Sequence, residues 1–230
     1  MTLAVAGASG SSPTFARILP FALYIAFLAA GPSLREALPA GWDDRWLYAL
    51  QIGLVIIALT WHARAYEELR ALAPGRRDAL VALAVGIAVF VLWIRLDSSG
   101  PMQNEPGAGF DPRTPSGDID WPLAGLRMIG AVAVVPIMEE LFWRSFILRF
   151  IDSPDFLNLP PASASWRALA VSAVLFAVEH HQWLAGLVAG LAYGALYMRS
   201  RTLWSPILAH GATNLLLGIW VLITESWRFW

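Results

Sequence analysis

The hydrophobic and polar positions of this chain alternate in long blocks rather than with the short period of a surface helix or strand. Apolar runs of membrane-spanning or slightly shorter length fall at 15–34, 46–62, 78–96, 121–148, 167–182, 183–198 and 203–223. A spanning helix needs about 20 apolar residues, so we expect the fifth and sixth runs to be buried among other helices. The pattern predicts an all-α fold, a polytopic transmembrane bundle of about seven or eight helices.

Polar and proline-rich segments separate these runs. The longest, 97–120, is rich in glycine, proline and aspartate and is typical of an extramembrane loop. Prolines 154, 160 and 161 interrupt the chain after the fourth run, and a further short segment within 149–166 stays open. We expect three parts: N-terminal helices with an outer polar loop at 1–120, a helical core that carries the chemistry at 121–223, and a C-terminal tail at 224–230.

Composition agrees with a membrane protein. The chain of 230 residues is 57% hydrophobic and only 14% charged, whereas a soluble domain is about 25% charged. Twelve tryptophans, many near the ends of the apolar runs, suit the membrane–water interface. The net charge of −1 gives no sign of nucleic-acid binding, and the absence of cysteine excludes disulfides, thiolate zinc sites and a cysteine nucleophile within this chain.

The placement of arginine predicts the orientation. With the N-terminus in the cytoplasm, nine arginines fall on the inner side, five fall outside, and Arg127 and Arg144 lie within a span. Arg17 followed by 18–30 could imitate a signal peptide, but the later spans favour an uncleaved first helix. The arginine-only, alanine-rich composition is typical of a high-GC bacterium, so we expect an integral protein of the bacterial inner membrane.

A strip of small residues follows one face of the sixth run. Gly186, Gly190 and Gly194 recur at intervals of four, which allows a neighbouring helix to approach closely in lipid. Glycine is also common in membrane helices in general, so the strip could occur without such a contact.

Acidic residues in the fourth run are the first sign of function. Glu139 and Glu140 are adjacent in an apolar stretch, where one acidic side chain costs about 2.5–3.5 kcal/mol at a helix centre. Arg144 follows Glu140 by one helical turn and can reach it. Alone, this group is also compatible with a buried ion pair that fixes helix packing.

Further polar side chains lie in the later runs. His180 and His181 end the fifth run, and His210 and Asn214 lie four residues apart on one face of the seventh. Each pair alone could be an interfacial pair or a single interhelical hydrogen bond. If the three helices pack together, the result is a polar intramembrane cavity.

Such a cavity suits the hydrolysis of a peptide bond without a protein nucleophile. A carboxylate and a neutral imidazole can deprotonate a water molecule, while a second imidazole and an amide can donate hydrogen bonds to the oxyanion. Glutamate and histidine are also ordinary zinc ligands, so a zinc-dependent membrane protease stays an alternative, although no His-Glu-x-x-His motif occurs.

Three ordered motifs resemble the CPBP family of intramembrane glutamic endopeptidases, which includes the type II CAAX prenyl proteases and bacterial Abi proteins. Glu-Glu-x-x-x-Arg matches 139–144, Phe-x-x-x-His matches 176–180, and His-x-x-x-Asn matches 210–214. The resemblance covers roughly 121–220.

The resemblance implies a role for each motif residue and no metal or other cofactor. Glu139 and His180 would activate the hydrolytic water, and His210 and Asn214 would stabilise the oxyanion. Glu140 and Arg144 would support and orient the site. The motif spacing selects His180, with His181 as the alternative, and Glu179 stays outside the expected set.

The expected partners are the lipid bilayer and a protein or peptide substrate. Some bacterial relatives resemble partners of exosortase-type sorting systems, whereas others act on peptide pheromones or confer bacteriocin immunity. The alternatives are a non-catalytic immunity or scaffold protein of the same fold and a proton-coupled transporter. The transporter is disfavoured because the chain has no paired repeats.

Overall fold

The computed structural model describes residues 12–71, 73–96 and 109–230. Within these ranges the chain is helical, and its one β-contact is an isolated bridge between Arg113 and Ile119. The main helices are α1 (Pro13–Glu36), α2 (Leu47–Trp61), α3 (Glu67–Arg70), α4 (Arg76–Leu96), α5 (Trp121–Ile129), α6 (Val135–Glu140), α7 (Leu148–Phe150), α8 (Trp166–Val178), α9 (Trp183–Ser200) and α10 (Trp204–Thr224). The predicted all-α fold is confirmed.

Each of the seven predicted apolar runs lies largely in helix. Among the described residues, four helices are long and apolar enough to cross a membrane: α1, α4, α10 and the continuous stretch Trp121–Phe150. The protein is therefore a helical membrane protein. The fifth run differs from the prediction because α8 ends at Val178, so that residues 179–182 form a turn.

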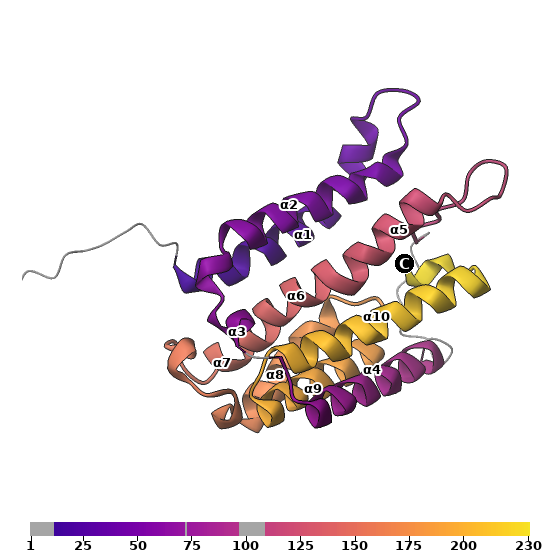
Figure 1. The fold of residues 1–230 in the computed structure, drawn as a ribbon. Coiled ribbons are helices and arrows are strands. Elements are labelled where there is room, and N and C mark those ends of the chain that lie inside the picture. The colour runs from indigo at the N-terminus through magenta and orange to yellow at the C-terminus, as the bar shows by residue number, and fades with distance from the viewer. Residues whose placement is uncertain (1–11, 72, 97–108) are drawn as a thin grey trace, which may run out of the picture.

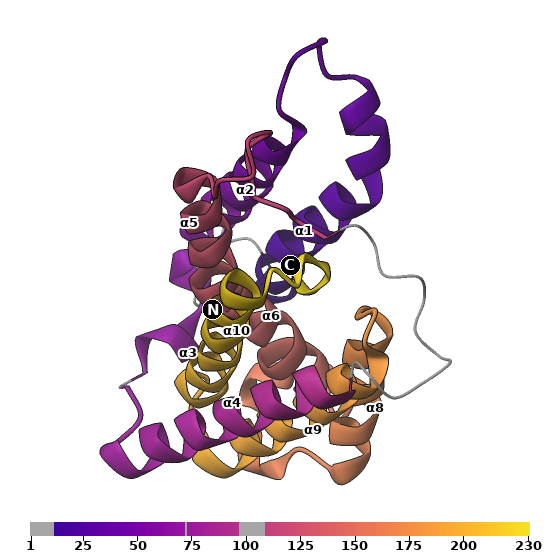
Figure 2. The same ribbon diagram turned by 90° about the vertical axis from the view of Figure 1, so that its right-hand side faces the viewer.

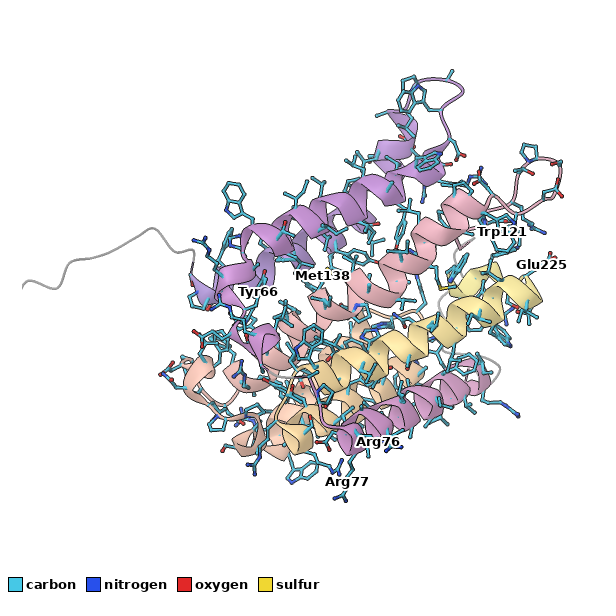
Figure 3. All side chains as sticks on the ribbon, in the orientation of Figure 1. Tyr66, Arg76, Arg77, Trp121, Met138 and Glu225 are labelled. Atoms are coloured by element: carbon cyan, nitrogen blue, oxygen red, sulfur yellow. The ribbon has the colours of Figure 1, made fainter. Side chains whose placement is uncertain are left out.

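The helices pack in layers around the broken helix α5–α7 and α10. In Figures 1 and 2, the α1–α2 pair lies on one side of this centre and α4, α8 and α9 lie on the other. Figure 3 shows Arg76 and Arg77 towards one end of the bundle and Trp121 and Glu225 at the opposite end.

Side-chain caps mark the start of two of the helical stretches that carry the polar motifs. Asp120 caps α5 by accepting a hydrogen bond from the N–H of Leu123 at 3.2 Å, and Ser165 caps α8 through the N–H of Ala168 at 3.0 Å. Asp152 in turn accepts hydrogen bonds from the backbone and hydroxyl of Ser165. These caps define where both helices start.

The stretch 121–150 is not a regular α-helix. Two π-helical segments, Gly130–Val134 and Leu141–Ile147, flank the short helix α6. The N–H of Val135 donates to the carbonyl of Gly130, five residues earlier. In the same pattern, the carbonyl of Ala131 would accept from the N–H of residue 136, which is a proline. Because proline has no N–H, the carbonyl of Ala131 is left without a helical donor.

The predicted glycine strip packs against α8. A Cβ atom at Gly190 would lie 2.9 Å from the Cα of Ala173, and one at Gly186 would lie 3.2 Å from the Cα of Ala177. Gly194 faces Leu169 in the same way. The absence of side chains on this face of α9 therefore brings α8 close to it and positions the turn that follows α8.

A cluster of charged residues joins α1 and α3 to the end of the broken helix. Glu68 forms ion pairs with Arg17 at 2.6 Å and with Arg149 at 2.8 Å. Ser145 donates a short hydrogen bond to Glu68 and accepts from Arg17 Nε at 2.9 Å. Burial alone would raise the pKa of Glu68, but the Arg17 guanidinium and these hydrogen bonds outweigh it and hold the pKa below its ordinary value of 4.5.

Candidate active site

A cavity of about 200 Å³ lies within the bundle, between the broken helix and α10. Four of the predicted site residues line it: Glu139, His180, His210 and Asn214. Its wall also includes Tyr24, Tyr48, Trp93, Arg127, Phe176, Tyr193 and Trp230. The other two predicted residues, Glu140 and Arg144, are fully buried next to these residues.

Glu140 joins α6 to α10. Its Oε1 accepts a hydrogen bond from His210 Nδ1 at 3.0 Å, and its Oε2 lies 3.1 Å from Arg144 Nε. The expected contact one turn apart between Glu140 and Arg144 is therefore present. Because Glu140 occupies Nδ1 of His210, only the Nε2 atom of this imidazole can act in the cavity.

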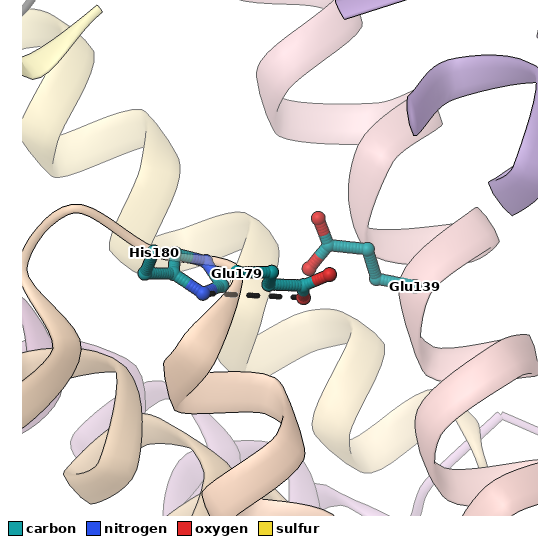
Figure 4. Close-up of side chains that lie close together, drawn as sticks. All are labelled: Glu139, Glu179 and His180. Carbon is teal, nitrogen blue, oxygen red and sulfur yellow. Dashed lines mark ion pairs between the residues drawn. The ribbon is translucent and has the colours of Figure 1, made fainter. Parts of the chain in front are cut away.

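Glu139 faces three polar neighbours. His210 Nε2 lies 3.9 Å from Glu139 Oε2, which has no hydrogen-bond partner. Glu179 and His180, from the turn after α8, approach the same carboxylate (Figure 4), and ligand atoms of the three residues all lie within 4.8 Å of one another. Water can therefore contact a carboxylate and an imidazole together at this point.

The turn after α8 determines which histidine faces the cavity. The carbonyl of Phe176 lies 2.7 Å from His180 Nδ1 and can only accept, so Nδ1 carries the proton and Nε2 of the neutral ring has a free lone pair. His181 is exposed and does not line the cavity. The motif spacing thus selects the histidine that lies in the cavity.

Asn214 has a structural contact as well as a place in the cavity wall. Its Nδ2 donates to the carbonyl of Ala131 at 2.8 Å, which is the acceptor that Pro136 leaves without a helical donor. The contact ties α10 to the π-helical segment. An amide nitrogen carries two hydrogens, so one remains for another acceptor.

Aromatic rings fix the orientation of the polar groups. The ring of Tyr193 stacks on that of His210 at 5.1 Å, and its hydroxyl donates to Thr213 at 2.6 Å. The guanidinium of Arg144 lies 4.4 Å from the centre of the Phe176 ring, which compensates in part for its two NH2 groups that lack hydrogen-bond partners.

Sequence reasoning missed several residues of this site. Tyr193 gave no signal because one tyrosine in an apolar helix is typical of a packed core. Glu179 was visible beside the histidine motif but was left outside the expected set. Arg127 was noted only as a charge within a span, and it lines the part of the cavity near Tyr24 and Tyr48.

A metal ion is chemically possible at one place among the described residues. Glu139, Glu179 and His180 offer one ligand atom each at compatible distances. Two carboxylates and one imidazole are a ligand set that zinc accepts.

Comparison with known protein families identifies the segment that contains this site. Residues 121–216 match the model of the Rce1-like family, described as type II CAAX prenyl endopeptidase Rce1-like. Over these residues the chain is similar to that family. The matched residues, fewer than half of the chain, include all three polar motifs. No curated protein and no solved structure matches the chain significantly.

The Rce1-like match confirms the resemblance seen in the motifs. It supports a membrane endopeptidase whose surroundings are the lipid bilayer and whose substrate is a peptide. The division of the chain at residue 120 and the roles of single residues stay predictions.

Proposed function

We propose that the protein is an intramembrane glutamic-type endopeptidase that cleaves a peptide bond with water as the nucleophile. One observation supports this most strongly: the cavity in the bundle is lined together by Glu139, His180, His210 and Asn214, which come from three separate parts of the chain. A bundle that only needed stability would gain little from gathering such groups in lipid.

Glu139 and His180 activate the water. Its two hydrogens point to the carboxylate of Glu139 and to Nε2 of His180, and Glu139 accepts one proton as the oxygen attacks the carbonyl carbon. The new C–O bond converts the carbonyl into an oxyanion. The tetrahedral intermediate then collapses, the C–N bond breaks, and the proton held by Glu139 passes to the leaving amine.

His210 and Asn214 stabilise the oxyanion. Glu140 accepts from Nδ1 of His210 and keeps Nε2 towards the cavity, where Nε2 donates to the oxyanion when the ring carries a proton on each nitrogen. Asn214 contributes its second amide hydrogen. Glu140 and Arg144 are thus positioning residues that act through His210, and they do not touch the substrate.

Cleavage of a co-expressed membrane peptide by the purified protein tests this mechanism. Glu139→Ala and His210→Ala should each lose about 100-fold or more in rate while they elute and melt as folded protein. Glu36→Gln, which removes an exposed carboxylate in α1, is the matched control and should cleave normally. Unchanged cleavage by both site variants would contradict the proposal.

The cluster of Glu139, Glu179 and His180 supports a second candidate, a zinc-dependent protease. The two mechanisms differ in the effect of chelation. Wild-type protein stripped with a strong chelator and shown by elemental analysis to lack bound metal should keep its activity if water is activated by Glu139 and His180 alone. Loss of activity that zinc restores would favour the metal mechanism.

Location and substrate follow from the same proposal. We infer an integral protein of a bacterial inner membrane with its N-terminus in the cytoplasm, acting on a C-terminal CAAX-like or sorting-signal segment or on a prepeptide. An exosortase-type system is one source of such signals. A reporter fused at the N-terminus tests the orientation, and co-expression with a sorting-signal protein tests the substrate.

A non-catalytic immunity or scaffold role would use the same cavity for binding. It predicts that Glu139→Gln keeps the cellular phenotype at normal abundance. The endopeptidase predicts that the phenotype is lost.

A further inference from the structure

Arg127 differs from the other arginines inside the bundle. Arg17, Arg144 and Arg149 each pair with a glutamate. Within the described part of the chain no carboxylate forms an ion pair with Arg127, and its Nε is buried without a hydrogen-bond partner. A cation that is kept in a membrane span without an anionic partner is an expected place for an anionic ligand.

Aromatic side chains hold this guanidinium in the wall of the cavity. It lies 4.5 Å from the centre of the Tyr48 ring and 5.7 Å from that of Phe110, and the phenol of Tyr24 lies beside it. The N–H of Phe110 donates to the carbonyl of Trp230 at 3.1 Å, and the Trp230 side chain also lines the cavity. The site is thus a built pocket whose positive charge has no ion-paired carboxylate among the residues that the structure describes.

We propose that Arg127 binds the C-terminal carboxylate of the peptide substrate and so sets the distance between the cleaved bond and the substrate's end. This inference rests on the proposed endopeptidase function. A planar guanidinium binds a carboxylate through two parallel hydrogen bonds, a geometry that an amide or an uncharged chain cannot supply.

The spacing along the helix limits the length of the released peptide. Arg127 and Glu139 are twelve residues apart on one continuous helical stretch, which separates their Cα atoms by about 18 Å or less. An extended peptide covers about 3.3–3.6 Å per residue. Since both side chains line the same cavity, the carboxylate lies at most about five residues beyond the cleaved bond.

Peptide binding to the full-length Glu139→Gln protein in phosphatidylcholine nanodiscs tests the proposal without turnover. The probes are fluorescent eight-residue alanine–leucine peptides that end in a free carboxylate, in an amide, or in an amide with glutamate at the penultimate position. The free acid should bind about tenfold or more tighter than the plain amide, because a hydrogen-bonded charge pair is lost with the amide.

Substitution of the arginine should remove this preference. Arg127→Gln in the same background should bind acid and amide equally, and Arg127→Lys should keep part of the preference. Arg199→Gln, which removes an exposed arginine at the end of α9, is the matched control and should leave the preference intact. Thermal melting shows that each variant is folded.

Three results would overturn the proposal. The proposal fails if the Glu139→Gln protein, which keeps Arg127, binds the acid and the amide equally or binds neither. It also fails if the preference for the acid survives Arg127→Gln. Binding of the penultimate-glutamate amide as tightly as the free acid assigns the pocket to side-chain carboxylates instead of a chain end. None of these results bears on whether Glu139 is needed for cleavage, so the two proposals fail separately.

Discussion

Two buried charge clusters contain residues of the same broken helix and differ in how well their groups are paired. Around Glu68, two arginines and the Ser145 hydroxyl all donate hydrogen bonds to one carboxylate. Around Glu139, the carboxylate oxygen Oε2 and both NH2 groups of Arg144 lack hydrogen-bond partners. The first cluster is a closed network, whereas the second leaves polar groups available at the wall of a cavity.

The difference shows how one protein uses buried charge in two ways. A fully paired network stabilises the contact between α1, α3 and the broken helix because breaking it would leave charges uncompensated. An incompletely paired cluster adds little to stability but keeps donors and acceptors ready for substrate and water. Variants of the two glutamates should therefore have opposite effects.

The largest effect is expected for Glu139→Gln. Loss of a general base should reduce the cleavage rate about 10²–10⁴-fold. The melting temperature should stay unchanged or rise, because a neutral amide replaces a buried carboxylate that has an unpaired oxygen. Cleavage kinetics and tryptophan-monitored melting of the purified protein measure both quantities, and a clear drop in stability would assign Glu139 to the fold as well.

Glu68→Gln should show the reverse. It leaves Arg17 and Arg149 without their carboxylate, which should lower the free energy of unfolding by about 3–5 kcal/mol. The rate of cleavage per folded molecule should be nearly unchanged, since the cluster does not line the cavity. Denaturant or thermal unfolding in detergent provides the measurement, with Glu36→Gln as a control for loss of a surface carboxylate. A variant as stable as wild type but inactive would remove the distinction between the clusters.

Ser145→Ala tests the same network with a smaller change. The hydroxyl accepts from Arg17 and from Arg149 at 2.9 Å and donates to Glu68. Its loss should cost about 1–3 kcal/mol, less than loss of the carboxylate, because both ion pairs remain. A destabilisation equal to that of Glu68→Gln would mean that the hydroxyl, and not the charge, holds the network together.

Hydropathy was sufficient to predict the helices, because length and apolar content determine which segments enter a bilayer. Spacing was sufficient to predict that Glu140 reaches Arg144 and that His210 and Asn214 share a face. The π-helical segment Gly130–Val134 was not predictable, since the missing N–H of Pro136 is compensated there by the amide of Asn214 from another helix. The early end of α8, which brings Glu179 beside Glu139, depends on tertiary packing in the same way.

Acid should weaken the Glu68 network specifically, and this is the smallest predicted effect. The folded-state pKa of Glu68 lies below its ordinary value of 4.5, because Arg17 and the hydrogen bonds favour the ionised form despite burial. Its contribution to stability is therefore complete above about pH 4.5 and is lost as the pH falls through the lowered folded-state pKa. The difference in melting temperature between wild type and Glu68→Gln should stay constant from about pH 7 to 5 and narrow at lower pH. A gap that persists unchanged at about pH 3 would show that side-chain shape, rather than charge, stabilises this end of the bundle.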